Sequence, residues 1–263
     1  MTIDAATNTI DPRRLPFASG AFNVRDLGGL PTEDGGNLAR GLVYRADGLH
    51  RLPSAEVERL AAAGIRTVVD LRTSGELEIA ASVRGEGIAV LHLPVLREVW
   101  PHDAFSEEET ADPVAFLVAR YVEMLDEGRA AIAAIFGLLA DEERRPLAFH
   151  CSAGKDRTGV VAALVLGLLG VPDDVIAEDY AASAEAMDQL VAWVREHRPE
   201  SADAMAAQPK AILSCPAEAM HGFLDRVRSD FGSIDGYLAE IGVPEATIAA
   251  IRAALTTPPS SAS

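Results

Sequence analysis

Cys151 is the residue of this sequence best suited to chemistry. It follows His150 and precedes Lys155 and Arg157 within HCSAGKDRTG, residues 150–159. Positive charges and the free N–H groups of a helix start favour the thiolate, which is the nucleophilic form of cysteine. The pattern HCxxGxxxxG is expected by chance only about 10⁻⁴ times in a chain of this composition. We therefore predict a nucleophilic Cys151 rather than an inert buried thiol.

The residues that follow Cys151 have the types that bind a phosphate group. Small side chains let the backbone approach an anion, and the N–H groups of the loop and of the next helix start would surround it. Arg157 supplies a planar fork that matches two phosphate oxygens. The predicted phosphate-binding residues are Ser152, Ala153, Gly154, Lys155, Asp156, Arg157 and Thr158.

This loop predicts phosphoryl transfer. Cys151 would take the phosphoryl group from a monoester, and water would then hydrolyse the phosphocysteine. The Thr158 hydroxyl can donate to the sulfur, which makes it a better leaving group in the second step. His150 is expected to support the loop by hydrogen bonding to its backbone. The reaction needs no cofactor, and the histidines show no metal-ligand spacing, so we expect no metal.

The elements that must position this loop alternate between strand-like and helix-like segments. This alternation is typical of an α/β protein whose central, mainly parallel sheet is flanked by helices. The predicted strands cover residues 42–46, 65–71, 88–95 and 146–149. The predicted helices cover residues 54–63, 113–126, 129–140, 157–170, 173–197, 216–229, 234–241 and 245–255. A further helix is expected after Thr73, which forms a capping box with Glu76.

Turn and cap residues set the expected boundaries. Ser54 is predicted to cap the first helix and Gly64 to end it. Prolines interrupt the helical pattern over residues 199–215, so a mobile connection or a helical lid is expected within residues 183–215. We expect a flexible segment over residues 1–16, one domain over residues 17–255 and a disordered tail over residues 256–263.

Composition limits the classes of partner. The chain has 263 residues and a formal net charge of −17. Long-range repulsion therefore argues against general binding to nucleic acid or to anionic membranes. The longest apolar run, residues 160–171, is far shorter than the roughly 20 residues that cross a bilayer, so no stable membrane insertion is expected.

Cysteine usage and the N-terminus bear on the compartment. Cys151 and Cys215 are too few for a disulfide framework, so a cytoplasmic location is the default expectation. Residues 1–14 show no classical signal peptide, which leaves export by another route open. Cys215 precedes Pro216 and is expected near a helix start, with a protective disulfide to Cys151 as the alternative.

Two blocks of motifs together resemble a known family. HCSAGKDRTG matches the HCxxGxxR[ST]G signature of cysteine-dependent tyrosine and dual-specificity phosphatases. The second block is NVRDLGG at residues 23–29, YRA at residues 44–46, and DLR at residues 70–72 with Glu76. Over residues 17–255 the chain resembles bacterial tyrosine phosphatases of the type found in mycobacteria and Listeria.

The resemblance implies an α/β phosphatase domain that acts on phosphotyrosine proteins or peptides. Family members often act also on phosphoserine, phosphothreonine or phosphoinositides, and the mycobacterial type has a helical lid. A lysine at the position of Lys155 would add a second cation for a multiply phosphorylated headgroup, or would only strengthen the field around one phosphate. The alternatives are a phosphoinositide phosphatase and a pseudophosphatase that binds phosphate without turnover.

The leaving oxygen needs a proton, and three aspartates are candidates for the general acid. The family resemblance favours Asp156, although the neighbouring cations favour its ionised form and only a bound phosphate dianion would offset them. Asp70 follows a predicted parallel strand, as Cys151 does, and could instead tie down Arg72. Asp103 lies in a segment that resembles the mobile acid loop of tyrosine phosphatases with one residue inserted.

Arg25 and Arg45 lie in the second block of motifs. Arg25, beside Asp26, is expected to stabilise the turn at Gly28, with substrate contact as the alternative. Arg45 is expected either to pair with a carboxylate under the site or to be solvated.

Overall fold

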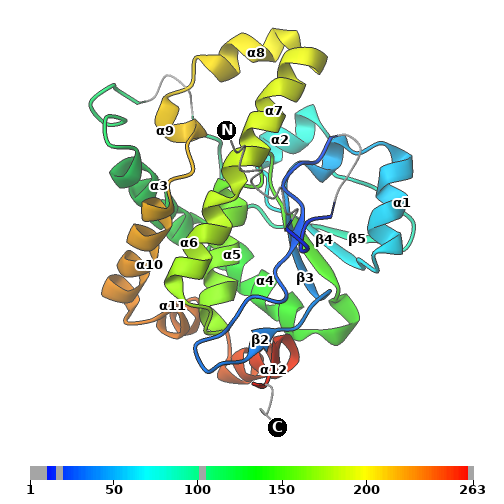
Figure 1. Ribbon diagram of the computed structural model, residues 1–263, viewed down its shortest axis with the longest axis vertical. Coiled ribbons are helices and arrows are strands. Elements are labelled where there is room, and N and C mark those ends of the chain that lie inside the picture. The colour runs from blue at the N-terminus through cyan, green and yellow to red at the C-terminus, as the bar shows by residue number, and fades with distance from the viewer. Residues whose placement is uncertain (1–10, 16–19, 101–104, 260–263) are drawn as a thin grey trace, which may run out of the picture.

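The computed structural model describes residues 11–15, 20–100 and 105–259. Its central sheet has five strands in the order β1-β3-β6-β4-β5 (Figure 1). Neighbouring strands are parallel except that β1 runs antiparallel to β3. The strands are β1 (Arg25–Asp26), β3 (Val43–Ala46), β4 (Thr67–Asp70), β5 (Ala89–His92) and β6 (Leu147–His150). The prediction of an α/β protein with a mainly parallel sheet is therefore confirmed.

Helices cover both faces of the sheet, and most of them lie on one face. The first half of the chain forms α1 (Ser54–Ala62), α2 (Ser74–Ile79), α3 (Pro113–Glu127) and α4 (Arg129–Ala140). The second half forms α5 (Asp156–Leu168), α6 (Asp173–Ala181), α7 (Ser183–His197), α8 (Pro199–Ala206), α9 (Lys210–Leu213), α10 (Ala217–Phe231), α11 (Ile234–Glu240) and α12 (Glu245–Leu255). Two short 3₁₀ helices are η1 (Leu49–Arg51) and η2 (Glu142–Arg144).

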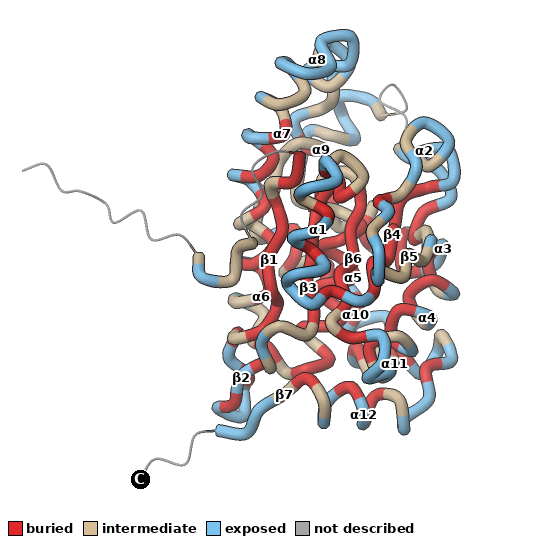
Figure 2. The backbone as a smooth tube through the Cα atoms, turned by 90° about the vertical axis from the view of Figure 1, so that its right-hand side faces the viewer, coloured by how far each residue is buried: buried red, intermediate tan, exposed pale blue. Residues whose placement is uncertain are grey.

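The core is divided by the sheet. The smaller apolar cluster joins α1 to one face of β3, β4 and β6. The larger cluster joins the other face to α3, α4, α5 and the C-terminal helices. Because α5 lies between the sheet and these outer helices, it is buried on nearly all sides, which explains its continuous apolar sequence. Figure 2 shows the buried strands and α5 in the interior, with α8 exposed at one end.

The register of the sheet brings three loops to one edge. Ala46, Asp70 and His150 are paired in the ladder of β3, β4 and β6. These strands are parallel, so all three lead into loops at the carboxyl edge of the sheet, where ligands of open α/β sheets bind. Cys151 leaves the central strand at that edge.

Most predicted element boundaries are correct to within a few residues. The capping box is confirmed: the Thr73 side chain accepts from the Glu76 N–H, and the Glu76 carboxylate accepts from the Thr73 N–H. Gly64 follows α1 with φ of 82°, as a helix stop requires. The assignment of Ser54 as a cap was wrong, because the N-cap is Pro53 and Ser54 is the first helical residue.

Two other expectations need correction, and a third region agrees with one of its alternatives. The predicted helix 173–197 is two helices, α6 and α7, separated at Ala182. The interrupted region 199–215 contains α8 and α9, as the helical alternative predicted, because prolines at helix starts allow helices to begin there. The tail predicted as disordered contains β7 (Thr256–Thr257), which pairs with β2 (Asn37–Leu38). Its last residues, 260–263, lie outside the described residues.

The predicted flexible segment 1–16 is also ordered in its described part. Arg14 forms an isolated bridge with Arg25 of β1, and Arg13 donates a hydrogen bond to Asp179 of α6. Residues 1–10 and 16 lie outside the described part of the chain. Among the described helices, none is long and apolar enough to cross a bilayer.

Candidate active site

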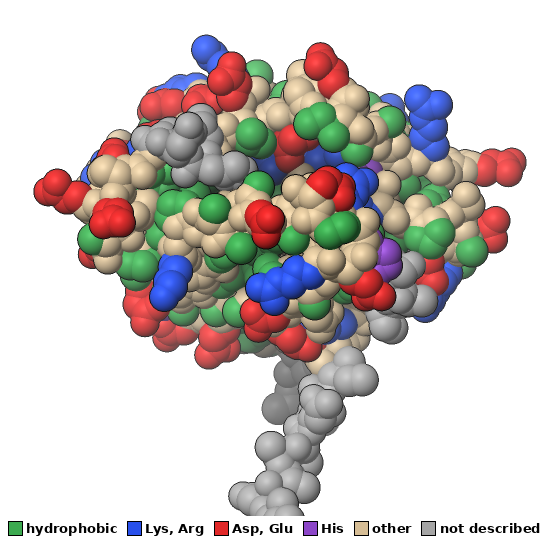
Figure 3. All heavy atoms as spheres, turned by 90° about the horizontal axis from the view of Figure 1, so that it is seen from above, with side chains coloured by type: hydrophobic (Ala, Val, Ile, Leu, Met, Phe, Trp, Pro, Cys, Tyr) green, Lys and Arg blue, Asp and Glu red, His purple; other side chains and the backbone are tan. Residues whose placement is uncertain are grey.

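A pocket of about 570 Å³ opens at the carboxyl edge of the sheet. Its floor is the Cys151 loop, by which we mean residues 151–157 between β6 and the first turn of α5. The residues of this loop that line the pocket are Cys151, Ser152, Ala153, Asp156 and Arg157. The opposite walls come from α7, α8 and α9 and from the segment before Pro101. Figure 3, which views the molecule from the α8 end, shows acidic and apolar side chains spread over this face.

Helices of the predicted lid region form the pocket's apolar wall. Met187 and Leu190 of α7, Met205 of α8 and Ile212 of α9 face the floor across the pocket. Residues 183–215, where a mobile connection or lid was expected, thus contribute to the pocket wall, and their movement as a lid stays a prediction.

Cys151 lies at the base of the pocket and is 2% exposed. The Thr158 hydroxyl donates a hydrogen bond to its sulfur, at 3.2 Å, as predicted from the sequence. The His150 Nδ1 lies 3.1 Å from the Cys151 carbonyl oxygen, and because a carbonyl only accepts, Nδ1 carries the proton. Burial lowers the pKa of His150 to about 4, so this imidazole is neutral near pH 7 and orients the loop.

Gly154 and Gly159 are glycines for different structural reasons. Gly154 has φ of 67°, and a Cβ there would lie 2.8 Å from the Ala46 carbonyl oxygen at the end of β3. At Gly159 a Cβ would lie 3.1 Å from the Tyr180 ring of α6. Glycine at this position therefore lets α5 pack closely against α6. Gly154 additionally lets the loop turn against β3, because a side chain would be strained and would clash there.

Arg157 is held by a carboxylate within the site. Its two terminal nitrogens donate to the two oxygens of Glu76, and the Ser152 hydroxyl donates to the same carboxylate at 2.5 Å. Burial opposes ionisation of Glu76, but the hydrogen bonds from Arg157 and Ser152 outweigh it and lower the pKa of Glu76 to about 2. Glu76 thus joins the N-terminus of α2 to Arg157, whereas the sequence analysis had assigned Glu76 only a capping role.

Lys155 is buried behind the pocket floor. Its ammonium donates to the Ile212 carbonyl of α9 at 2.5 Å and lies 3.1 Å from Asp156 Oδ1. Lys155 is not among the described residues that line the pocket. The side chain therefore connects the Cys151 loop to α9 in this conformation.

Asp156 lies at the pocket with a buried tyrosine behind it. The Tyr121 hydroxyl donates to Asp156 Oδ1 at 2.7 Å. Burial and then the Asp156 charge raise the pKa of Tyr121, so this phenol stays protonated and remains a donor. The Asp156 side chain is 19% exposed, which lets it reach a bound substrate from the first turn of α5.

Asp70 does not reach the pocket. It is fully buried, accepts from the Arg72 guanidinium at 2.8 Å and from the Ser82 hydroxyl at 2.6 Å. Burial opposes ionisation of Asp70, but these hydrogen bonds and the field of His150 prevail and lower its pKa. The structure therefore favours the structural alternative for Asp70, because its carboxylate is committed to Arg72 and it is absent from the pocket lining. Asp103 lies outside the described residues.

Two arginines hold carbonyl groups of the Cys151 loop. Arg51 of η1 donates from Nη1 to the Ser152 carbonyl at 2.9 Å and also lines the pocket beneath Trp193 of α7. Arg45 of β3 donates from Nη2 to the Gly154 carbonyl at 2.8 Å. The sequence analysis did not single out Arg51, since no motif marks it.

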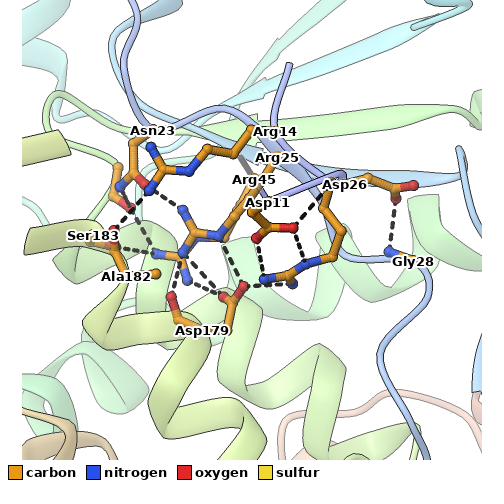
Figure 4. A network of polar contacts seen from close by, with 12 residues as sticks. Asp11, Arg14, Asn23, Arg25, Asp26, Gly28, Arg45, Asp179, Ala182 and Ser183 are labelled. Atoms are coloured by element: carbon orange, nitrogen blue, oxygen red, sulfur yellow. Dashed lines mark hydrogen bonds and ion pairs between the residues drawn. The ribbon is translucent and has the colours of Figure 1, made fainter. Parts of the chain in front are cut away.

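Asp179 of α6 pairs with three arginines, two of which, Arg25 and Arg45, are labelled in Figure 4. Arg13, Arg25 and Arg45 each pair with its carboxylate, at 3.0, 2.9 and 2.7 Å. Asp26, in contrast, accepts from the N–H groups of Gly28 and Gly41 and stabilises the turn without Arg25. Arg45 therefore pairs with a carboxylate, one of its two predicted arrangements, while Arg25 joins β1 to α6 and does not stabilise the turn. No motif or spacing in the sequence marks Asp179.

Cys215 is not bonded to Cys151. Both cysteines are free and buried. Burial raises the pKa of Cys215 to about 11, against the pull of Lys155. Its thiol is thus a packing group in this conformation.

Comparisons with known proteins relate the chain to one family. Residues 17–257 match the tyrosine phosphatase family. The triple specificity protein phosphatase PtpB of Mycobacterium tuberculosis is 30% identical, over 92% of this chain and 98% of its own. A tyrosine-protein phosphatase of Nostoc commune is 28% identical, over 95% of this chain and 88% of its own. The solved structure of P. aeruginosa TpbA with pTyr is 19% identical, covers 66% of this chain and 91% of its own, and gives a TM-score of 0.30.

The family match spans the sheet, the Cys151 loop and the helices that wall the pocket. The matched residues include Cys151, Arg157 and Thr158 of the loop and the following helix start. The chain belongs to the tyrosine phosphatase family.

Proposed function

We propose that this protein hydrolyses phosphotyrosine in proteins or peptides through a phosphocysteine intermediate formed on Cys151. The observation that carries the proposal is the position of the Cys151 sulfur at the pocket floor, with the Thr158 hydroxyl donating to it at 3.2 Å. Arg157 lines the same floor and offers a fork for the phosphate.

In the first step the Cys151 thiolate attacks phosphorus, and the bond from phosphorus to the ester oxygen breaks. Asp156 gives its proton to that oxygen, so the alcohol leaves neutral. Arg157 and the N–H groups of the loop stabilise the charge on the three remaining phosphoryl oxygens. The Arg157 guanidinium has five N–H donors, and Glu76 engages only its two terminal nitrogens, so donors remain for phosphate.

In the second step water attacks phosphorus and the bond from phosphorus to sulfur breaks. The Asp156 carboxylate accepts the proton of the attacking water, which returns it to its acid form. The Thr158 hydroxyl donates to the departing sulfur, and this contact stabilises the thiolate as a leaving group.

The pocket wall supports an aryl phosphate as the first substrate class. Met187, Leu190 and Met205 face the floor and would contact the ring of a phosphotyrosine. Phosphoserine, phosphothreonine and phosphoinositides are second candidates, given the triple specificity in the name of the mycobacterial relative. Lys155 is directed to Ile212 in this structure, which gives the phosphoinositide candidate less support.

Phosphate release tests the proposal. The substrates are a phosphotyrosine peptide, a phosphothreonine peptide and a phosphoinositide, each with EDTA present and with Cys151→Ser as the control. We expect release from the phosphotyrosine peptide first, and none with Cys151→Ser. No release from any substrate would contradict the phosphatase proposal, and activity in Cys151→Ser would contradict the mechanism.

Leaving-group dependence tests the general acid. Asp156→Asn should slow hydrolysis of phenyl phosphate much more than hydrolysis of an aryl phosphate with a strongly acidic phenol, because the latter leaves without a proton. Equal slowing of both substrates would remove Asp156 from proton donation.

A further inference from the structure

Arg45 is a buried arginine of β3 that contacts the Cys151 loop without lining the pocket. Its side chain is 1% exposed. Nη2 donates to the Gly154 carbonyl at 2.8 Å, and Nη1 donates to Asp179 Oδ2 at 2.7 Å. One guanidinium therefore joins a carboxylate of α6 to a carbonyl of the loop. Figure 4 shows Arg45 beside Asp179. Asn23 donates from Nδ2 to the same carbonyl at 3.0 Å.

The direction of the Gly154 carbonyl determines the direction of the next N–H group. The peptide bond between Gly154 and Lys155 is trans and planar, so the carbonyl and the Lys155 N–H point to opposite sides. When Arg45 holds the carbonyl, the N–H is turned away from Arg45. A carbonyl turned toward a bound phosphate would repel it, whereas an N–H attracts it.

The Ser152 carbonyl is held in the same manner by a different arginine. Arg51 Nη1 and the Gly48 N–H donate to it at 2.9 and 3.2 Å. Two peptide groups of the loop, separated by one residue, are thus fixed by donors from β3 and the turn that follows it. The orientation of the loop's N–H groups therefore depends on side chains outside the loop.

The charges behind the loop are not balanced within the cluster. Arg25 and Arg45 are both 1% exposed and share one carboxylate, Asp179, with Arg13 as a third partner. Burial and the neighbouring Arg25 lower the pKa of Arg45 to about 10, while Asp179 and Cys151 act in the opposite direction. A surplus of buried positive charge favours an anion nearby, and the loop is the adjacent anion site.

On the basis of the proposed function, we propose that Arg45 is a positioning residue of the phosphatase reaction. It holds the Gly154 carbonyl back so that the Lys155 N–H faces the phosphoryl group, and Asp179 fixes its guanidinium in that position. Arg45 acts through the loop and does not touch the substrate.

The test compares arginines that share the Asp179 carboxylate. Arg45→Gln and Arg45→Lys remove the fork that reaches Gly154, whereas the control Arg13→Gln removes a partner of Asp179 that has no contact with the loop. The readouts are kcat and KM on a phosphotyrosine peptide, the inhibition constant of inorganic phosphate, and the melting temperature.

We expect Arg45→Gln to weaken phosphate binding and to lower kcat/KM by about 10- to 100-fold, because a preorganised donor is misplaced. Arg45→Lys keeps the charge beside Asp179 and should lose most of the same activity, since a point charge does not replace the fork. Arg13→Gln should lower the melting temperature while kcat and the inhibition constant stay within about twofold of the wild type.

Two results would overturn the proposal: Arg45 variants with wild-type phosphate affinity and kcat, or an equal loss in Arg13→Gln. If Arg45→Gln fails to fold, Arg45→Lys and Asn23→Ala test the proposal in its place. Asn23→Ala removes the second donor to the Gly154 carbonyl and leaves the arginine pairs of Asp179 intact. A wild-type protein that releases no phosphate would contradict the proposed function instead, and phosphate affinity alone would then decide the role of Arg45.

Discussion

Two arginine–carboxylate clusters lie on opposite sides of the Cys151 loop and differ in burial. At the pocket, Arg157 and Glu76 are 10% and 16% exposed. Behind the loop, Arg45 and Asp179 are each 1% exposed. The pocket pair lies where the proposed substrate would place its phosphate, so we expect its contacts to be exchangeable. The rear pair contacts the loop backbone at the Gly154 carbonyl, and we expect it to keep that backbone in place.

We expect the pocket pair to act mainly in substrate binding and the rear pair mainly in holding the loop in its binding conformation. A charge pair near solvent contributes little net stability, because water competes for both partners. A buried pair is costly to break, because the remaining charge has no solvent. Predictions at the two clusters should therefore separate activity from stability.

The largest expected effect on stability is at the rear cluster. Asp179→Ala would leave Arg25 and Arg45 buried without a carboxylate, and the free energy of unfolding should fall by about 3–5 kcal/mol. Glu76→Ala, at the pocket cluster, should cost less, about 1–2 kcal/mol, because it removes part of the helix cap and the partner of Arg157 but both side chains of that pair keep some contact with water. Urea unfolding of both variants measures the difference, and equal losses would contradict the comparison.

The largest expected effect on activity is at the pocket cluster. Arg157→Lys keeps the charge but loses the fork that holds two phosphate oxygens, so kcat/KM should fall by about 10²- to 10³-fold. The melting temperature should change little. Arg228→Lys, in an exposed pair with Asp173, is the matched control and should retain activity. A large fall in melting temperature with Arg157→Lys would show that the Arg157–Glu76 pair contributes to stability as the rear cluster does, which would contradict the comparison.

A smaller effect is expected when the pocket carboxylate loses its charge. Glu76→Gln keeps the shape of the side chain but holds Arg157 less firmly, so kcat should fall by about tenfold. Inorganic phosphate should bind at least as tightly as to the wild type, because the competing negative charge is gone. The split between kcat and phosphate inhibition checks this prediction; a parallel weakening of phosphate binding would contradict it.

The smallest expected effect is on stability in acid. The folded pKa of Glu76 is about 2, below its ordinary value of 4.5. The stabilisation from this carboxylate is thus fully present above about pH 4.5 and is lost as the pH falls toward 2. Melting curves of wild type and Glu76→Gln should differ most near pH 6 and converge toward pH 2. A difference that is independent of pH would show that the Glu76 charge does not contribute.

The sequence predicted the pocket floor well and the support behind it poorly. The strand, loop and helix around Cys151 are contiguous, so their chemistry and their local structure follow from neighbouring residues. Asp179 lies 154 residues from Arg25, with which it pairs, and its own segment resembles a solvated helix face. Arg51 carries no motif, and only the ladder between β3 and β6 brings its turn beside the loop.

The candidates for the general acid also show what local sequence leaves open. Asp70 and Asp156 were both candidates, because one follows a parallel strand and the other lies in the loop, and the sequence places both near the carboxyl edge of the sheet. Arg72 lies two residues from Asp70, and a sequence allows this pair to be either a surface contact or a buried one. Packing decided it by burying Asp70 completely against Arg72 and Ser82.

By itself, the sequence determined the α/β alternation and the capping box, and it led to the proposed roles of Cys151 and Arg157, since each depends on residues within a few positions of one another. Tertiary structure alone decided the direction of Lys155, the partner of Arg157 and the anchoring of the loop carbonyls. These contacts join segments distant in the chain, and their energies depend on burial, which local sequence does not specify.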